Sequence, residues 1–145
     1  MKLSGIHHLN VRCTEADLGS IEKFYTEVVG LRKGYRPDFK NTGIWLYDGD
    51  HPLVHVTVRC KEGDLGGAKH NSAVDHIAFR SYGAADFRAH LDRLGLAYEQ
   101  QNVPQAGYQI FLRDPMGTML EFNFPNEEAP QTVSSGTLAP RTKVA

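Results

Sequence analysis

The chain has 145 residues, with 16 Lys and Arg, 17 Asp and Glu, and a formal net charge of −1. Its length suits one ordinary globular domain, and 41% hydrophobic with 23% charged residues exclude a disordered or collagen-like protein. No run approaches the roughly 20 apolar residues of a membrane span, and the basic residues are too dispersed to favour binding to nucleic acid. Without a secretory signal or a CxxC pair, the sequence predicts a cytoplasmic protein with reduced, buried cysteines.

The first half of the chain predicts a strand, a helix and three more strands. Apolar and polar residues alternate in the opening strand, and apolar residues recur every three or four positions in the helix until Gly30, which is suited to end it. Turn residues at Pro37-Asp38 and Asp48-Gly49-Asp50 separate the later strands. The expected segments are 5–13, the helix at 21–29, and strands near 32–36, 43–47 and 52–60.

The second half repeats this order. The expected segments are a strand at 74–80, a helix at 84–94 before Gly95, and strands near 97–101, 108–113 and 118–124. We therefore predict an α+β fold of two tandem βαβββ modules, at 1–60 and 73–124, forming a single domain at 1–124. Residues 61–72, with three glycines and four charged residues, are expected to be a linker, and 125–145 a C-terminal tail.

Superposing the two halves tests whether they are a duplication. An offset of 66 or 68 residues places His55 on Glu121 and His8 on His76, while apolar residues of the later strands fall on apolar residues. Because a strand commits alternate residues to opposite faces, the large apolar residues share one face and these four polar residues share the other. The match favours an internal duplication.

These four side chains form the candidate functional site. Three imidazoles and a carboxylate that meet in one cavity would suit one divalent transition metal ion, such as Fe, Mn, Ni, Co or Zn, and would not suit calcium. A lone histidine on a strand is more often a surface or hydrogen-bonded residue, but an inward Glu121 must be paired or coordinated. Three further histidines are assigned no role because they lie off this face or in turns: His7, His51 and His70.

Other polar residues share the face of the four. They are Asn10, Arg12, Thr57, Arg59, Arg80 and Asn123. They predict either a polar or anionic substrate, such as a carboxylate or a thiol conjugate, or a network of ion pairs between strands. Four aromatic residues could form a cavity wall or simply pack within strands: Tyr35, Trp45, Tyr47 and Tyr108. We take Asn10, Arg12, Arg80 and Tyr108 as the candidate substrate-binding residues.

Three stretches resemble one known family. They are Gly5-Ile6-His7-His8-Leu9-Asn10-Val11 with the later Phe24-Tyr25 and Val29-Gly30-Leu31, then Val74-Asp75-His76-Ile77-Ala78-Phe79, and finally Asp114-Pro115-Met116-Gly117-Thr118-Met119-Leu120-Glu121-Phe122. In this order they resemble the vicinal oxygen chelate superfamily, which holds glyoxalases, bleomycin resistance proteins and extradiol dioxygenases, and a glyoxalase-like subgroup of it. The resemblance implies half-sheets curved around a metal site with His8, His76 and Glu121 as ligands.

The resemblance implies an enzyme, with alternatives. His55 occupies the family's fourth ligand position, which is Glu in glyoxalase I and Gln in methylmalonyl-CoA epimerase. The first expectation is a lyase or isomerase similar to lactoylglutathione lyase, in which Glu121 moves a proton, His55 assists, and the metal stabilises an enediolate. The alternatives are an Fe(II) extradiol-type ring-cleaving dioxygenase and a non-catalytic drug-binding protein. A small-molecule substrate and a homodimer are expected.

Overall fold

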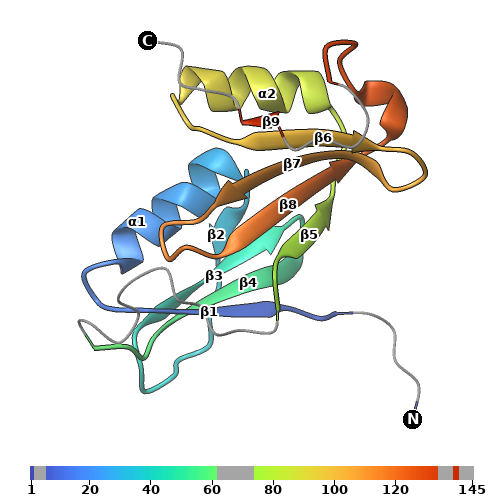
Figure 1. Ribbon diagram of the computed structural model, residues 1–145. Coiled ribbons are helices and arrows are strands. Elements are labelled where there is room, and N and C mark those ends of the chain that lie inside the picture. Colours follow the sequence, from blue (N-terminus) through green and yellow to red (C-terminus); the bar gives the residue numbers. More distant parts are fainter. Residues whose placement is uncertain (2–5, 62–73, 134–138, 141–145) are drawn as a thin grey trace. The chain divides into compact units, whose positions relative to one another are not determined.

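The computed structural model describes residues 1, 6–61, 74–133 and 139–140. Two compact units divide the chain, Met1–His70 and Asn71–Ala145, and each has its own sheet (Figure 1). The predicted linker at 61–72 lies, apart from Lys61, outside the described residues.

The first unit is a mixed sheet of four strands with one helix. Its strands lie in the order β1-β4-β3-β2, with β1 parallel to β4 and the other neighbours antiparallel. The elements are β1 (Leu9–Cys13), α1 (Leu18–Lys23) with a π-helical turn (Phe24–Val28), β2 (Arg32–Gly34), β3 (Gly43–Asp48) and β4 (His51–Val58). The predicted βαβββ order is confirmed, and the parallel pairing of its first and last strands requires the helical crossover between them.

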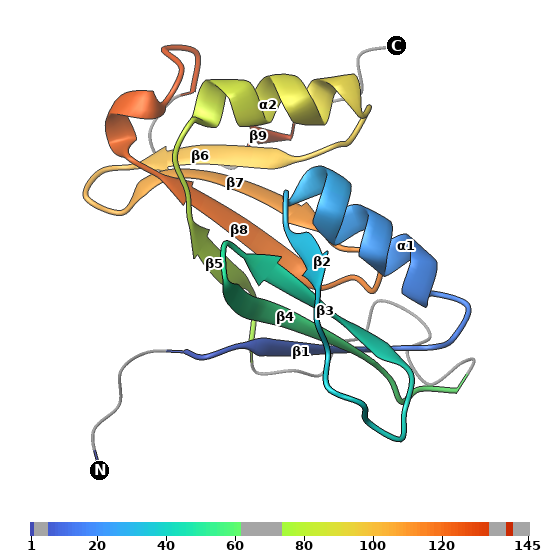
Figure 2. The same cartoon turned by 180° about the vertical axis from the view of Figure 1, so that it is seen from behind.

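The second unit repeats the plan and adds a strand. Its order is β5-β8-β7-β6-β9, with β5 parallel to β8 and every other pair antiparallel. The elements are β5 (Ile77–Arg80), α2 (Ala84–Arg93), β6 (Glu99–Val103), β7 (Gly107–Arg113), β8 (Met119–Phe124), a 3₁₀ turn (Asn126–Glu128) and β9 (Ala139–Pro140). Figures 1 and 2 show one helix beside each sheet.

Strand register confirms the match between the two halves. Asn10 lies opposite His55 in the first unit, and Ala78 lies opposite Glu121 in the second, which are equivalent positions. The predicted fold class, two βαβββ modules, is therefore confirmed at the level of individual strand pairs.

Both helices end in the same way. Gly30 and Gly95 adopt left-handed backbone with φ of 87° and 66°, a conformation that glycine adopts without a steric penalty. The leucine after each glycine then donates its N–H back to the helix: Leu31 to the carbonyl of Tyr25 at 2.9 Å, and Leu96 to that of Leu91 at 3.1 Å. The predicted stops at Gly30 and Gly95 are confirmed.

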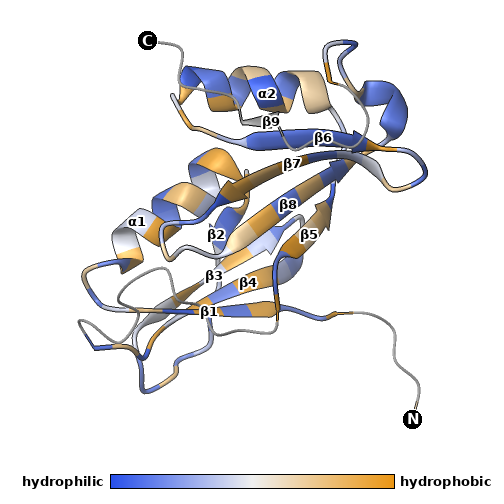
Figure 3. Ribbon diagram, in the orientation of Figure 1, coloured by the Kyte–Doolittle hydropathy of each residue, from blue (hydrophilic) through white to orange (hydrophobic). Residues whose placement is uncertain are grey.

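Each unit buries an apolar core on one side of its sheet. In the second unit, Phe87 of α2 packs against Phe122 and Phe124 of β8, with ring centroids 4.6 and 6.0 Å apart. Leu91 is fully buried on the same helix, as Ile21 is on α1. Figure 3 shows hydrophobic residues along β7, whereas β6 is hydrophilic. Among the described residues, no helix is long and apolar enough to cross a membrane.

The segment predicted to be a tail contributes to the second unit. Its first part forms the 3₁₀ turn, and the Glu128 carboxylate accepts hydrogen bonds from the backbone N–H groups of Gly83 and Ala84 at 2.8 and 2.6 Å. These are orphan donors at the start of α2, and a carboxylate is the group that best satisfies them. Further on, β9 pairs with the outer edge of β6.

The two cysteines are free thiols. Cys13 is fully buried in β1, and burial raises the pKa of its thiol to about 11, so it stays protonated at neutral pH. Cys60 is half-buried. Both cysteines are unpaired as expected, but the expected burial holds for Cys13 and only partly for Cys60.

Candidate functional site

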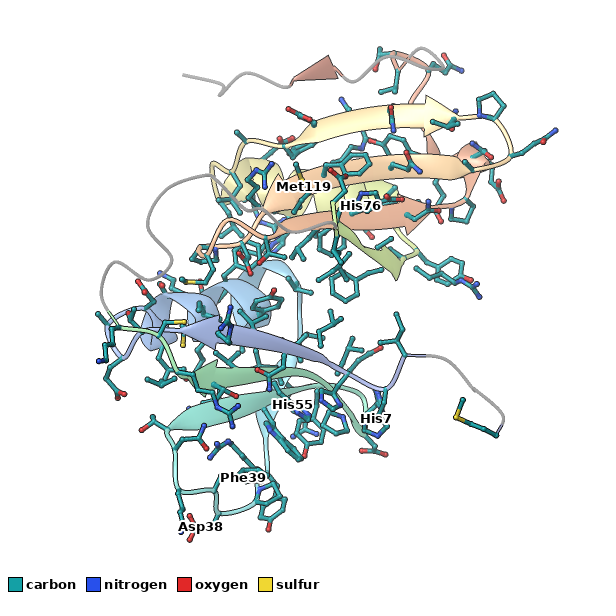
Figure 4. The ribbon with its side chains drawn as sticks, turned by 60° about the horizontal axis from the view of Figure 1, so that its bottom comes forward. His7, Asp38, Phe39, His55, His76 and Met119 are labelled. Carbon is teal, nitrogen blue, oxygen red and sulfur yellow. The ribbon has the colours of Figure 1, made fainter. Side chains whose placement is uncertain are left out.

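In the first unit, His55 of β4 is held between two other rings. On one face the His8 ring stacks at 3.9 Å with an interplanar angle of 17°, and on the other the Trp45 indole stacks at 4.0 Å and 6°. Trp45 is the register partner of His55 on β3, and His8 precedes β1 by one residue. Three neighbouring strand segments thus fix the plane of one imidazole, and Figure 4 shows His55 in this unit close to His7.

This packing determines the charge of His55. The side chain is 7% exposed, and among the described residues its Nε2 has no hydrogen-bond partner. Burial lowers the pKa of His55, and a nearby charge on His8 lowers it further, against a raising effect of the Pro52 backbone. The imidazole is therefore neutral at neutral pH, the form that binds a metal ion or accepts a proton.

A series of flat groups leads from His55 to the loop between β2 and β3. The Phe39 ring lies 6.1 Å from Trp45, and the Arg36 guanidinium lies 4.8 Å from the centre of Phe39. Figure 4 places Phe39 and Asp38 on this loop. Of the aromatic residues expected to form a wall, Trp45 contacts His55, whereas the Tyr47 hydroxyl donates to the Tyr35 carbonyl at 2.6 Å.

Two histidines that were assigned no role lie beside His8. The Nδ1 atoms of His7 and His8 are 3.0 Å apart, and the His51 ring lies 5.1 Å from that of His7. His7 lies off the predicted face by parity, but it precedes the first residue of β1 and is not held to strand geometry. A parity argument therefore could not place it.

In the second unit, His76 and Glu121 are paired. His76 Nε2 lies 2.8 Å from Glu121 Oε2, and Glu121 is only 4% exposed. The second oxygen of the carboxylate, Oε1, accepts a hydrogen bond from Asn123 Nδ2 at 2.9 Å. Both oxygens of a buried carboxylate therefore have partners, as the cost of burying a charge requires.

Asp75 completes a line of three groups. Its Oδ1 lies 2.8 Å from His76 Nδ1, so each nitrogen of one imidazole faces a carboxylate oxygen. Neutral imidazole has one N–H only, so it can donate to one of the two carboxylates, and its other nitrogen has a lone pair available for a cation. A carboxylate behind a histidine is also the usual arrangement that orients a histidine ligand. Asp75 was not among the predicted site residues, although its position directly before His76 suggests that its carboxylate could reach the imidazole.

The other predicted residues are placed differently from one another. Asn10 donates to Thr57 Oγ1 at 3.3 Å, on the strands that carry His55. Arg12 and Arg80 are exposed, and neither forms a hydrogen bond or ion pair within the described ranges. Tyr108 is fully buried: its hydroxyl donates to Gln100 at 2.5 Å and its ring packs against Phe124. A substrate contact by Tyr108 stays a prediction, and it does not enter the proposals below.

The donor residues are grouped as two pairs. In the part of the chain that the structure describes, no three His, Cys, Asp or Glu side chains form a cluster that could hold a metal ion. The first unit brings together His8 and His55, and the second brings together His76 and Glu121. Their chemistry, imidazole nitrogen with one carboxylate, fits a divalent first-row ion. Whether all four bind one ion stays a prediction.

No protein-family model matches the sequence, and no curated protein matches it. Solved structures do match. A glyoxylase/bleomycin resistance protein/dioxygenase domain from a Frankia species is 20% identical with a TM-score of 0.70, over 88% of this chain and 96% of that one. The fosfomycin resistance protein FosX from Listeria monocytogenes, complexed with Mn(II) and 1S,2S-dihydroxypropylphosphonic acid, is 16% identical with a TM-score of 0.63, over 86% and 94%.

A third similar structure has a different role. It is TnmS3, an antibiotic binding protein from a Streptomyces species, which is 16% identical with a TM-score of 0.62, over 86% of this chain and 98% of that one. Likeness at such identities establishes the fold. The resemblance expected from the sequence is therefore confirmed for the fold, which this chain shares with a glyoxylase/bleomycin resistance protein/dioxygenase domain and with FosX.

Proposed function

We propose that this chain, which has the glyoxalase/bleomycin resistance/dioxygenase fold, is a divalent-metal-dependent enzyme of the lyase or isomerase type that acts on a small substrate with adjacent oxygen atoms. The observation that carries the proposal is the line Asp75–His76–Glu121, in which both imidazole nitrogens face carboxylate oxygens. This arrangement would let one nitrogen and one oxygen bind a shared cation. The Mn(II) in the FosX structure is a precedent within the same fold.

The proposed ligands are His8, His55, His76 and Glu121. His55 suits this role because it is neutral and its Nε2 is unpartnered among the described residues. Three neutral imidazoles and one carboxylate would leave a divalent ion with a local charge of about +1. Such an ion would acidify the α-proton of a substrate and stabilise an enediolate.

Glu121 is the proposed base. Asn123 holds Oε1, so Oε2 is the atom that would accept the α-proton and return it to the adjacent carbon, and for this it would have to leave the ion and His76 Nε2. His55, held neutral between His8 and Trp45, is the candidate for a second base.

A dioxygenase is the second candidate. His8, His76 and Glu121 would be the two-histidine, one-carboxylate set that is typical of non-haem Fe(II) oxygenases. One observation favours an aromatic substrate: flat groups from Trp45 to Phe39 lie on one side of His55. A hemithioacetal screen and a catechol screen, each under air and under argon, would separate the candidates, because only ring cleavage consumes O₂.

Metal content tests the ligand set. His8→Ala and Glu121→Ala should each lose most of the bound metal by elemental analysis, with an unchanged circular dichroism spectrum. The matched control is Glu99→Ala, an exposed glutamate of β6, which should keep the metal. Full metal retention in both ligand variants would refute the proposal. A metal-free protein that still binds an antibiotic would support a binding role like that of TnmS3.

Mixing variants tests whether the two pairs come from one chain or two. One variant carries His8→Ala with His55→Ala, and the other carries His76→Ala with Glu121→Ala. If a homodimer combines pairs from different chains, refolding the two together should restore about a quarter of the metal binding, because random pairing makes about half of the dimers mixed and each mixed dimer has one intact site of two. If each site uses one chain, the mixture should bind no more than the variants alone. Light scattering after size exclusion gives the oligomeric state in either case.

A further inference from the structure

A pocket of about 360 Å³ lies in the second unit. The residues that matter for its chemistry are Arg80, Tyr82, Gln105, Asn123, Asn126 and Glu127. They come from the ends of β5 and β8, the β6–β7 turn and the start of the 3₁₀ turn. Its volume is within the range of small-molecule sites, about 300 to 1,000 Å³.

Arg80 is the cation of this pocket. It is exposed on β5, and it forms no hydrogen bond or ion pair within the described residues, whereas Arg36 and Arg113 donate to the carbonyls of Asn41 and Gly117. An unpaired guanidinium presents a planar fork of N–H donors that matches a carboxylate. Arg80 is therefore available to bind an anion.

Asn123 connects the pocket with Glu121. It is the register partner of Arg80, and its Nδ2 donates to Glu121 Oε1 and to the Ala106 carbonyl, both at 2.9 Å. The Cβ of any residue other than glycine at position 107 would clash with Asn123 Oδ1, and Gly107 has φ of 105°. The backbone at Gly107 thus leaves room for the side chain that carries the connection.

The register sets a distance between the pocket and Glu121. The pair Ala78 and Glu121 and the pair Arg80 and Asn123 are two residues apart on the same face of β5 and β8. Two residues of strand span about 7 Å. A molecule anchored at Arg80 could therefore place a carbon about 7 Å from its anionic group next to the Glu121 carboxylate.

The charges select the kind of anion. Among the described lining residues, Arg80 is the cation and Glu127 the acid. The pocket therefore offers a single guanidinium, which matches a single carboxylate of a ligand. A dianionic phosphate would meet a single cation and a nearby carboxylate, which is unfavourable. Gln105 and Asn126 add amides that can pair with an amide of the ligand, and the Tyr82 side chain, 74% exposed, adds a flat surface.

We infer that this pocket binds the carboxylate end of an amide-containing small molecule, with Arg80 as the anchor. That the bound molecule is the substrate, with its reacting carbon at Glu121, rests on the proposed function. That the pocket binds such a molecule does not.

The test uses two probes, N-acetylglycine and its uncharged analogue N-acetylglycinamide, titrated into isotopically labelled protein and followed by NMR. N-acetylglycine should shift the backbone amide signals of Ser81, Gln105 and Asn126, and Arg80→Gln should weaken its binding about tenfold or more, the usual effect of a charged hydrogen bond. The control Arg93→Gln removes an exposed arginine from α2 and should leave the affinity unchanged. Inorganic phosphate should bind more weakly than N-acetylglycine.

Equal affinity for the two probes, or an unchanged affinity in Arg80→Gln, would overturn the inference. Stronger binding of phosphate would overturn the choice of a carboxylate. The metal measurements above decide the proposed function separately: probe binding in a protein that holds no metal would support the pocket and refute the metal enzyme. Metal binding without probe binding would do the reverse.

Discussion

The two units share one backbone plan but have different donors at one pair of equivalent positions. In β4 the residue after Val54 is His55, and in β8 the residue after Leu120 is Glu121, and each strand pairs with the strand that directly follows the unit's other donor, His8 or His76. His55 is packed between two rings and kept neutral, whereas Glu121 is paired with His76 and accepts a hydrogen bond from Asn123. The register determines where each side chain lies, and the neighbouring side chains determine what it is bonded to.

This difference divides the chemistry of the chain between its units. The first unit offers an uncharged imidazole nitrogen, because burial opposes protonation of His55. The second unit offers the buried carboxylate, with a second carboxylate, Asp75, behind its histidine. Exchanging the residue types at these two positions, or destabilising the helices and cores of the two units, tests how far the units are equivalent.

The largest expected effect is on the cores. Ile21→Ala in α1 and Leu91→Ala in α2 each remove a fully buried side chain, and each should lower the free energy of unfolding by about 2 to 5 kcal/mol. Urea titration followed by circular dichroism measures the loss, and fluorescence of the single tryptophan, Trp45, reports on the first unit. A loss below about 1 kcal/mol in only one variant would show that its helix is not equivalent to the other. Lys23→Ala and Arg93→Ala are the exposed controls.

Exchanging the equivalent residues should give the next effect. His55→Glu makes the first unit resemble the second, and a second carboxylate should raise the affinity for Mn²⁺ about tenfold or more if position 55 is a ligand, because it neutralises the remaining charge of the ion. Calorimetric titration with Mn²⁺ measures this, and the exposed His51→Glu is the control. If position 55 is remote from the ion, the affinity will not rise and the buried, unpaired carboxylate will only lower stability.

A smaller effect is expected at the N-terminal ends of the two helices, which are capped differently. In the first unit, Thr14 and Asp17 bond to each other just before α1, whereas α2 starts at Ala84 and takes its cap from Glu128, 44 residues later. Glu128→Gln should lower the free energy of unfolding by about 1 kcal/mol, because it weakens a charged cap. Thermal unfolding measures the change, with Glu99→Gln as the exposed control. An unchanged melting temperature would show that the carboxylate does not stabilise α2.

The smallest effect concerns pH. Because the pKa of His55 is lowered, its contribution to stability is complete above about 6.5, the value of free imidazole, and is lost as the pH falls through the lowered folded value, since the unfolded chain binds the proton first. Trp45 fluorescence should stay constant as the pH falls to about 6.5 and decrease only below it, when a stacked imidazolium quenches the indole. His55→Gln should remove the decrease. A midpoint above that of free imidazole would contradict the assignment of a neutral His55.

The strand period explains what could be predicted from the sequence. Alternation identified the face shared by His55 with Asn10 and by Glu121 with Asn123, because side-chain direction in a strand depends only on parity. Helix ends were predictable because Gly30 and Gly95 act through local backbone. The burial of Tyr108 follows from the same alternation, because Tyr108 shares its parity with the buried Ile110 and Leu112.

Other features depend on contacts that are remote in sequence. The stacking of Trp45 on His55 requires knowledge of ring planes on two strands, and the capping of α2 by Glu128 joins residues 44 positions apart. The π-helical turn after α1 was also missed, because its apolar spacing matches that of an ordinary helix. The donor residues of the candidate site were therefore predictable from the sequence, whereas the side chains that they contact became known only from the structure.

The small strand β9 has a practical consequence for shortening the chain. One edge strand of the first sheet is β2, and its exposed Arg32 and Lys33 discourage pairing with a strand of another molecule. Strand β6 is protected differently: β9 occupies its outer edge, and β6 itself is rich in Gln and Asn. A chain truncated before Ala139 would expose the backbone edge of β6 to other copies of the chain. On heating or concentration, such a chain should aggregate before it unfolds.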